Sequence, residues 1–265
     1  MTQKQSTAAS PGAINRLVYG IARHWLALFN FLVAIYIGLP VLAPVLMNVG
    51  AMGPARAIYT IYSPLCHQMA SRSYFLFGDQ IAYPRAVAGT SLTPIEAYMP
   101  DLPEFAGASA DPADWTAFIW SARRFLGNEQ MGYKMALCER DMGIYGAVLL
   151  AGLFYGLLRR FRPVNMDGQL VGIKPLPVWA FLLFGLGPIA LDGFSQLFSQ
   201  YIAVLVPEGA SVLTMLPLRE STPLLRTLTG AIFGVSLVWL TYPHIDRSMQ
   251  QTAESQREAL FGEPS

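Results

Sequence analysis

The side chains best suited to chemistry are Cys66 and Cys138, the only two cysteines in the chain. Each lies in a short polar segment, and His67 directly follows the first cysteine. Three interpretations are open: a Cys66–Cys138 disulfide, a redox-active dithiol, or a metal site. For a metal site, the expected ligands are Cys66, His67, Cys138 and Asp192. Two thiolates, an imidazole and a carboxylate suit zinc.

The segment around Cys66 predicts the start of a helix. Ser63 is a typical N-cap and Pro64 a typical first helical residue. Cys66 would then lie in the first helical turn, where the helix dipole lowers the pKa of a thiol. Gln68 and Arg72 follow in the same segment and are candidate site residues with it.

Two other polar groups show helical spacing. Asp141 and Tyr145 follow Cys138 at three and seven residues, so the three side chains are expected on one helix face. Asp192 and Gln196 lie four residues apart inside an apolar run and are expected one helical turn apart. These segments therefore predict that polar side chains project from two different membrane helices.

A carboxylate inside a membrane segment normally has a charged partner. For Asp192 the first candidate is Arg226, with Arg140 and Arg219 behind it. One interpretation is a salt bridge that locks two spans together. The other is a site in which Asp192, Arg226 and Arg140 are catalytic. In that site Arg72, Arg140, Arg219 and Arg226 would bind a phosphate, which the guanidinium group matches in geometry.

The composition places these residues in a membrane protein. The 265 residues are 53% hydrophobic and only 13% charged, with a mean hydropathy of +0.38. Soluble domains carry about 25% charged residues, so this chain is expected to bury its surface in a lipid bilayer. The net charge of +1 excludes the strong basic bias of a nucleic-acid-binding protein.

The charge-free runs predict an all-α fold, a bundle of four transmembrane helices, with five spans as the alternative. A helix needs about 20 residues to cross roughly 30 Å of hydrocarbon. The predicted spans are residues 25–47, 142–158, 177–206 and 224–242. The predicted segments outside them are a tail of residues 1–24, a long segment 48–141 with the Cys-His-Gln motif, loops 159–176 and 207–223, and a tail 243–265.

Lysine and arginine predict the orientation of the spans, because they are enriched in cytoplasmic segments. They gather in both tails and in loop 159–176. We therefore expect a multi-pass protein of a prokaryotic plasma membrane with both termini in the cytoplasm and segment 48–141 outside. Cys138, Asp192 and Arg226 would then meet in the outer leaflet, each at the outer end of a different span.

The long outer segment contains two ambiguous stretches. Residues 55–70 are mostly apolar and are interpreted as a surface or re-entrant segment, with a fifth span as the alternative. Residues 115–126 have helical spacing and would cover the site, lie on the membrane surface, or pack on the rest of the segment. Residues 100–114 are rich in Pro, Ala and acidic side chains and predict irregular coil.

Four motifs together resemble an uncharacterised family of prokaryotic integral membrane proteins, domain of unknown function 2085. They are Cys66-His67-Gln68 with Arg72-Ser73-Tyr74-Phe75 and Gly78; Cys138-x-Arg140-Asp141-x-x-Ile144-Tyr145; Asp192-Gly193-x-x-Gln196; and Arg226-x-x-Thr229-Gly230-x-x-x-Gly234. The resemblance spans about residues 60 to 240 and implies a membrane protein with a shared polar site. Many relatives join the first two motifs by a short link, whereas here residues 79–137 separate them.

Three functions are compatible with this pattern. The first is a membrane-embedded enzyme that acts on a lipid-like or anionic substrate with a metal or thiolate at its centre. The second is a non-catalytic subunit of a membrane assembly, stapled by a disulfide and salt bridges. The third is a small transporter or metal-handling protein. The lipid bilayer is the expected partner, together with a homo-oligomer or a membrane complex.

Overall fold

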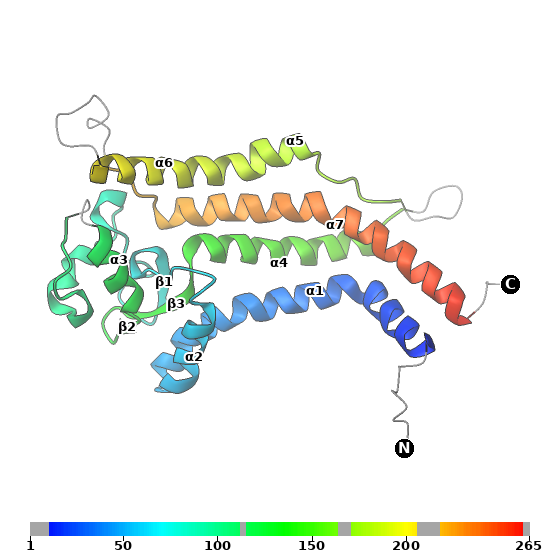
Figure 1. Ribbon diagram of the computed structural model, residues 1–265, viewed down its shortest axis with the longest axis horizontal. Helices are drawn as coiled ribbons and strands as arrows, with labels where there is room; N and C mark the ends of the chain where they lie inside the picture. The colour runs from blue at the N-terminus through cyan, green and yellow to red at the C-terminus, as the bar shows by residue number, and fades with distance from the viewer. Residues whose placement is uncertain (1–10, 112–114, 164–170, 206–217, 262–265) are drawn as a thin grey trace, which may run out of the picture.

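The computed structural model describes residues 11–111, 115–163, 171–205 and 218–261. Four of its helices are long and apolar enough to cross a membrane, over Gly12–Asn48, Glu139–Arg160, Val178–Ala203 and Pro223–Phe261. They lie side by side along the long axis of the molecule (Figure 1). The predicted all-α membrane bundle of four spans is therefore confirmed. The predicted loop 207–223 falls largely outside the described residues, as do parts of both tails and of loop 159–176.

The four spans begin and end as follows. Helix α1 covers Pro11–Asn48, α4 covers Glu139–Arg160, and α7 covers Pro223–Phe261. The third span consists of α5 (Val178–Ala180), a π-helical segment (Phe181–Leu186) and α6 (Gly187–Leu205). Many large apolar side chains on these helices are exposed, including Leu150 and Leu191. Such an outer surface suits lipid rather than water.

Helices α4 and α7 approach each other closely because glycines line their contact. A Cβ atom on Gly230 would lie 2.5 Å from the carbonyl oxygen of Arg140, and one on Gly234 would lie 2.4 Å from that of Ile144. On the facing helix, a Cβ on Gly143 would lie 2.4 Å from the carbonyl oxygen of Thr227. Small residues permit this close backbone contact in membranes, and the contact fixes the start of α4 against the start of α7.

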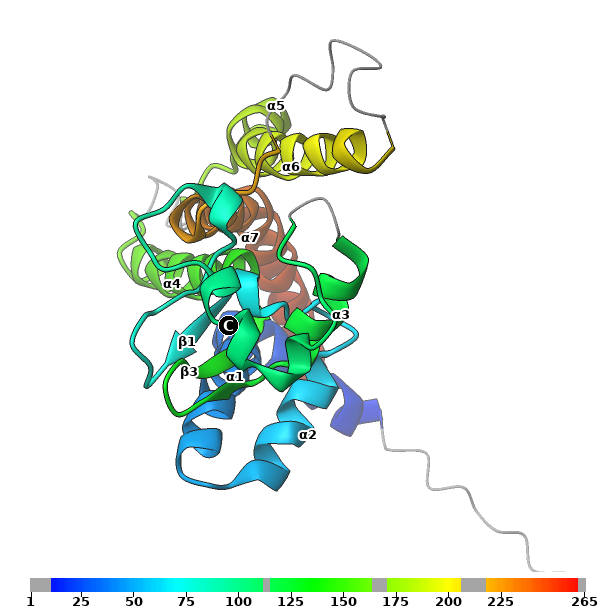
Figure 2. The same cartoon turned by 90° about the vertical axis from the view of Figure 1, so that its left-hand side faces the viewer.

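One end of the bundle carries a small folded cap with a sheet that the sequence did not predict. Strands β1 (Ser73–Leu76), β3 (Gly132–Cys138) and β2 (Gly127–Asn128) form an antiparallel sheet in the order β1-β3-β2. Ser73 pairs with Cys138 in this sheet. Figure 2 shows the cap end-on, with α6 at one edge and α2 at the other. The strand pairing brings the segment that follows Cys66 next to Cys138.

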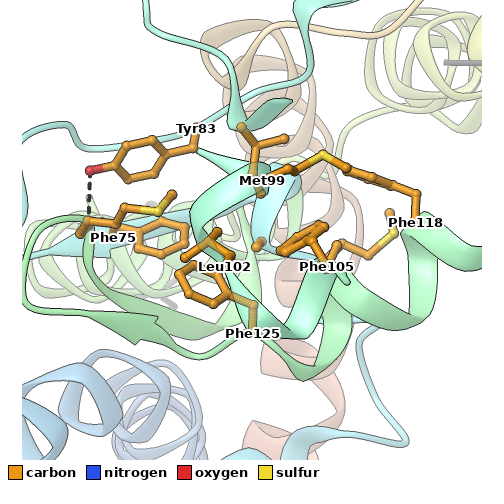
Figure 3. Close-up of a cluster of buried hydrophobic side chains, with 12 residues drawn as sticks. Phe75, Tyr83, Met99, Leu102, Phe105, Phe118 and Phe125 are labelled. Atoms are coloured by element: carbon orange, nitrogen blue, oxygen red, sulfur yellow. Dashed lines mark hydrogen bonds between the residues drawn. The ribbon is translucent and has the colours of Figure 1, made fainter. Parts of the chain in front are cut away.

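The cap has its own apolar core, which Figure 3 shows. Its aromatic members include Phe75 of β1, Phe118 of helix α3 (Trp115–Arg124), and Phe105 and Phe125 from the chain on either side of α3. The hydroxyl of Tyr83 donates a hydrogen bond to the carbonyl of Met131 at 3.1 Å. The predicted helix over residues 115–126 thus packs one face on this core.

The segment that follows α1 folds back against it. Helix α2 (Met52–Tyr62) has 11 residues, which is too short to cross a bilayer, so residues 55–70 are not a span in the structure. The prediction that Cys66 lies in the first turn of a helix is wrong. Ser63 is the C-cap of α2, and the N–H of Cys66 donates to the carbonyl of Tyr62 at 3.0 Å. Pro64 comes just after the C-cap because proline cannot continue a helix.

Candidate functional site

A cavity of about 510 Å³ lies where the cap meets the bundle. Its walls come from the turn after α2, from α3, from the start of α4, from α6 and from the segment that leads into α7. The polar side chains in these walls are Cys66, His67, Gln68, Arg72, Cys138, Arg140, Asp141, Gln196, Gln200, Arg219, Glu220 and Arg226. The polar motifs that the sequence predicted to lie at the same depth in the membrane therefore all contribute residues to the wall of one cavity.

Two thiols and a carboxylate form a tight group in this cavity. The ligand atoms of Cys66, Cys138 and Asp141 all lie within 4.8 Å of one another. The thiol of Cys138 donates to Asp141 Oδ2 at 3.2 Å, and the backbone N–H of Cys138 donates to Cys66 Sγ at 3.3 Å. Both cysteines are free thiols in the structure.

Local structure explains why these three groups meet. Cys138 ends β3 and is the N-cap of α4, and Asp141 lies in the first turn of that helix. A carboxylate in a first turn interacts favourably with the helix dipole. Interaction with the Cys138 side chain lowers the pKa of Cys66, although burial opposes it. The same contact with Cys66, together with burial, raises the pKa of Cys138.

The turn that carries Cys66 is held by Gln68 and by a buried lysine. Gln68 has a left-handed backbone conformation with φ of 52°, and its side-chain amide donates to the Tyr59 carbonyl at 2.9 Å. Its own carbonyl accepts from Lys134 Nζ at 2.5 Å. Complete burial lowers the pKa of Lys134 to about 7. Sequence reasoning missed this lysine, although a single charge in the apolar run of residues 132–138 is a visible signal.

Asp192 is buried and accepts hydrogen bonds from several partners. Arg140 forms an ion pair with it, and Arg219 Nη2 lies 3.2 Å from its other carboxylate oxygen. Gln196 Nε2 donates to it at 3.2 Å, and the Ser221 hydroxyl also donates to it. The prediction that Arg226 is its first partner is wrong. The two arginines that ranked behind Arg226 are the partners.

Arg226 instead belongs to a neighbouring network. It pairs with Glu139 at 3.1 Å and with Glu220 at 2.7 Å, and Arg72 pairs with Glu220 at 2.9 Å. Burial raises the pKa of Glu220, but the guanidinium groups of Arg72 and Arg226 outweigh burial and hold it below its usual value. Gln196 joins the two networks, because its side-chain carbonyl accepts from Arg226 at 3.4 Å.

The arginines differ in their access to the cavity. The Arg226 side chain is only 3% exposed, whereas Arg72, Arg140 and Arg219 are 29%, 26% and 40% exposed. Arg140 and Arg219 share the single carboxylate of Asp192. This side of the cavity therefore carries more positive than negative charge, and Arg140 Nε has no hydrogen-bond partner among the described residues.

An apolar wall faces these charges. Leu65, Trp115, Ile119 and Leu197 line the same cavity. The guanidinium of Arg72 lies 5.0 Å from the centre of the Trp115 ring, within the range of a cation–π contact. Helix α3 therefore packs on the cap core with Phe118 and also covers the cavity.

Three predicted site residues lie apart from the thiol group. His67 is exposed and lines the cavity, but it is not part of the cluster of Cys66, Cys138 and Asp141. Tyr145 packs on Tyr36, with ring centres 4.6 Å apart, and does not line the cavity. Asp192 does not line it either, because its carboxylate is enclosed by its partners.

Residues 129–240 match a family model described as "Predicted membrane protein (DUF2085)". This segment is similar to that family. The DUF2085 match includes Cys138, Asp192 and Arg226 and begins after the Cys66 segment. The chain is also 24% identical over 186 residues to the uncharacterised protein MJ1492 of Methanocaldococcus jannaschii, an alignment that covers 70% of this chain and 67% of the relative. No solved structure matches the chain.

Proposed function

We propose that the protein is a membrane-embedded enzyme that acts on an anionic, lipid-like substrate in the cavity between cap and bundle. The observation that supports this most strongly is the sharing of Asp192 by two arginines that remain partly exposed at the cavity. Arg140 and Arg219 each have donors to spare, since a guanidinium carries five N–H groups. A phosphate or carboxylate of a substrate would complete this arrangement.

The cavity has the mixed character that a lipid-like molecule needs. The arginines would bind its charged group, while Trp115, Ile119 and Leu197 would contact its apolar part. The cavity lies at one end of the four apolar helices, so in a membrane it would lie where the headgroup of a lipid meets its acyl chains. With the lysine and arginine distribution of the sequence, this end would face the outside of a plasma membrane and both termini the cytoplasm.

The reactive group of this enzyme would be the cluster of Cys66, Cys138 and Asp141. These side chains line the same cavity as the arginines, so a bound anion would lie close to them. Asp192 has a different role in this proposal. It is a positioning residue, because its carboxylate orients Arg140 and Arg219 from behind the cavity wall.

Binding of a defined lipid tests the proposal. Full-length protein in nanodiscs would be titrated with short-chain phosphatidic acid, with short-chain diacylglycerol as the neutral control. We expect the phosphate-bearing probe to bind and Arg140→Gln to weaken it about tenfold, which corresponds to roughly 1.4 kcal/mol. Arg124→Gln is the matched control, since Arg124 is exposed and lies outside the cavity lining.

Two results would count against the enzyme. Equal binding of the charged and neutral probes would show that the arginines do not select an anion. A large loss of thermal stability in Arg140→Gln, without any loss of probe binding, would favour a purely structural salt bridge. In that case the non-catalytic membrane subunit becomes the better interpretation.

A further inference from the structure

We propose that Cys66, Cys138 and Asp141 bind a zinc-like divalent ion and leave one coordination position open to the cavity. A role of this ion in catalysis rests on the proposed function, whereas the presence of the binding site does not. The three ligands differ from the set expected from the sequence. Asp141 takes the place of Asp192, and His67 lies outside the group.

The spacing of the three ligand atoms suits four-coordinate zinc. Zinc–ligand bonds of about 2.0–2.3 Å place neighbouring ligands of a tetrahedron roughly 3.3–3.8 Å apart. Cys138 Sγ and Asp141 Oδ2 are 3.2 Å apart, and all three ligand atoms lie within 4.8 Å of one another. Only small shifts of these ligand atoms are therefore needed to surround a central ion.

Each ligand is held by a separate element, so the group is arranged before an ion binds. Cys66 follows α2, Cys138 ends β3, and Asp141 lies in the first turn of α4. The pairing of Ser73 in β1 with Cys138 in β3 brings the segment that follows Cys66 to the end of β3. Cys138 and Asp141 are fixed relative to each other by the first turn of α4.

The surroundings of the sulfurs suit thiolates. Cys66 Sγ accepts the backbone N–H of Cys138 at 3.3 Å. The left-handed conformation of Gln68 shapes this turn. Backbone donors of this kind favour the charged form of their acceptor.

The donor set points to the class of metal. Two sulfurs and one oxygen select zinc over magnesium or calcium, which prefer oxygen ligands alone. Three protein ligands with an open fourth position are typical of catalytic zinc sites, whereas structural sites use four protein ligands. The open position would face the cavity, where the anion held by Arg140 and Arg219 would bind.

Asp192 is unsuited to be a ligand of this ion. Its carboxylate already accepts hydrogen bonds from Arg140, Arg219, Gln196 and Ser221. Binding a metal there would require it to give up these partners. Asp141, in contrast, accepts a hydrogen bond from the thiol of Cys138, and a thiol loses its proton when it binds a metal.

Metal content and thiol protection test the site together. Full-length protein purified in detergent would be loaded with Zn²⁺, passed over a desalting column, and analysed for bound metal and for alkylation of each cysteine. We expect one zinc per chain and protection of both cysteines from alkylation. Cys138→Ser and Asp141→Asn should each lose most of the zinc. His67→Ala is the matched control and should retain it, because His67 lines the same cavity without joining the group.

A measurement on the unmutated protein covers the case in which a cysteine variant does not fold. Loading with Co²⁺ should produce a sulfur-to-cobalt charge-transfer band and the visible spectrum of a four-coordinate ion. Absence of that band, less than stoichiometric zinc with freely alkylated thiols, or loss of zinc in His67→Ala would each overturn the proposed ligand set. A Cys66–Cys138 disulfide in protein purified without reductant would overturn it as well.

The metal site and the proposed function can fail separately. Arg140→Gln should keep zinc while it loses phosphatidic acid. Wild-type protein that binds zinc but not the lipid probe would leave the metal site intact and overturn the anionic substrate. Wild-type protein that binds the lipid probe but no zinc would overturn the metal site and leave the anionic substrate in place.

Discussion

Each end of the bundle contains a buried carboxylate that is shared by two arginines. At the cavity end, Asp192 pairs with Arg140 and Arg219. At the opposite end, Asp246 of α7 pairs with Arg159 in the last turn of α4 and with Arg162 just after that helix. The sequence indicated the first of these carboxylates and missed the second.

The surroundings of the two carboxylates differ. Around Asp246 the other partners are the indole of Trp25, which donates to it at 3.3 Å, the hydroxyl of Tyr155 and the amide of Gln250. These side chains tie α1, α4 and α7 together. Asp192 instead stands behind a cavity that also holds two thiols and another carboxylate. A buried ion pair is thus common to both ends, and the two thiols beside Asp141 distinguish the candidate site from a staple.

The largest effect that would sharpen this contrast is expected at the staple. Asp246→Ala should lower the free energy of unfolding by roughly 3–5 kcal/mol, because it leaves the nearly buried Arg162 without its counter-charge. Thermal unfolding in detergent would measure the change, with the exposed Glu258→Ala as control. Zinc and lipid-probe binding should persist in the fraction that stays folded. A variant as stable as the wild type would remove the distinction between the two ends.

An intermediate effect is expected where α4 meets α7. Gly230→Ala places a methyl group 2.5 Å from the Arg140 carbonyl oxygen, so the helices must move apart. Overpacking of this kind typically costs about 1–3 kcal/mol. Because the first turn of α4 carries Arg140 and Asp141, affinity for both zinc and the lipid probe should fall. A methyl group on Gly38 would meet nothing within 4 Å. Gly38→Ala should therefore leave the free energy of unfolding, the zinc affinity and the affinity for the lipid probe unchanged.

A smaller effect should separate the two parts of the cavity. Trp115→Ala removes the ring beside Arg72 and part of the apolar wall. We expect the affinity for short-chain phosphatidic acid to fall about fivefold, which corresponds to roughly 1 kcal/mol. Zinc binding should be unchanged, and parallel titrations of the two ligands would show the difference. Equal losses of both would mean that α3 supports the whole site and not its apolar wall alone.

The smallest expected effect concerns acid. The pKa of Glu220 in the folded protein lies below its usual value of 4.5. The stability that its ion pairs provide is therefore fully present above pH 4.5, and it is lost as the pH falls through the folded-state pKa. The stability difference between wild type and Glu220→Gln, on the order of 1 kcal/mol at neutral pH, should therefore shrink in acid. Melting temperatures at neutral and strongly acidic pH would measure it. A difference that grows in acid would show the opposite sign of the shift.

The fold could be predicted well because each span is a local property of the sequence. A long run without charge predicts a membrane helix wherever it occurs, and the four runs correspond to four helices. Counting residues from the ends of the runs also placed Cys138, Asp192 and Arg226 at one level. Depth follows from the rise per residue of a helix.

The errors concern features that depend on contacts between elements. The partner of Asp192 depends on how α4 and α7 are rotated about their axes, and the glycine contacts that set this rotation are not read from spacing alone. Ser63 and Pro64 fit both the start of a helix and its end, and the preceding α2 decides for the end. The sheet was missed because β1 and β2 have only four and two residues, too few for a clear alternation.

The direct pairing of β1 with β3 also bears on how this protein varies among its relatives. Ser73 and Cys138 are neighbours across two paired strands. The chain between β1 and β3 therefore leaves the sheet and returns to it at nearly the same place, as a long insertion. An insertion of this kind can change in length without breaking the β1–β3 pairing that holds Cys138 beside the segment that follows Cys66. The insertion also carries Trp115 and Ile119 into the cavity wall. In the proposed function, a change of this segment would alter the apolar wall of the cavity without moving Cys138 away from β1.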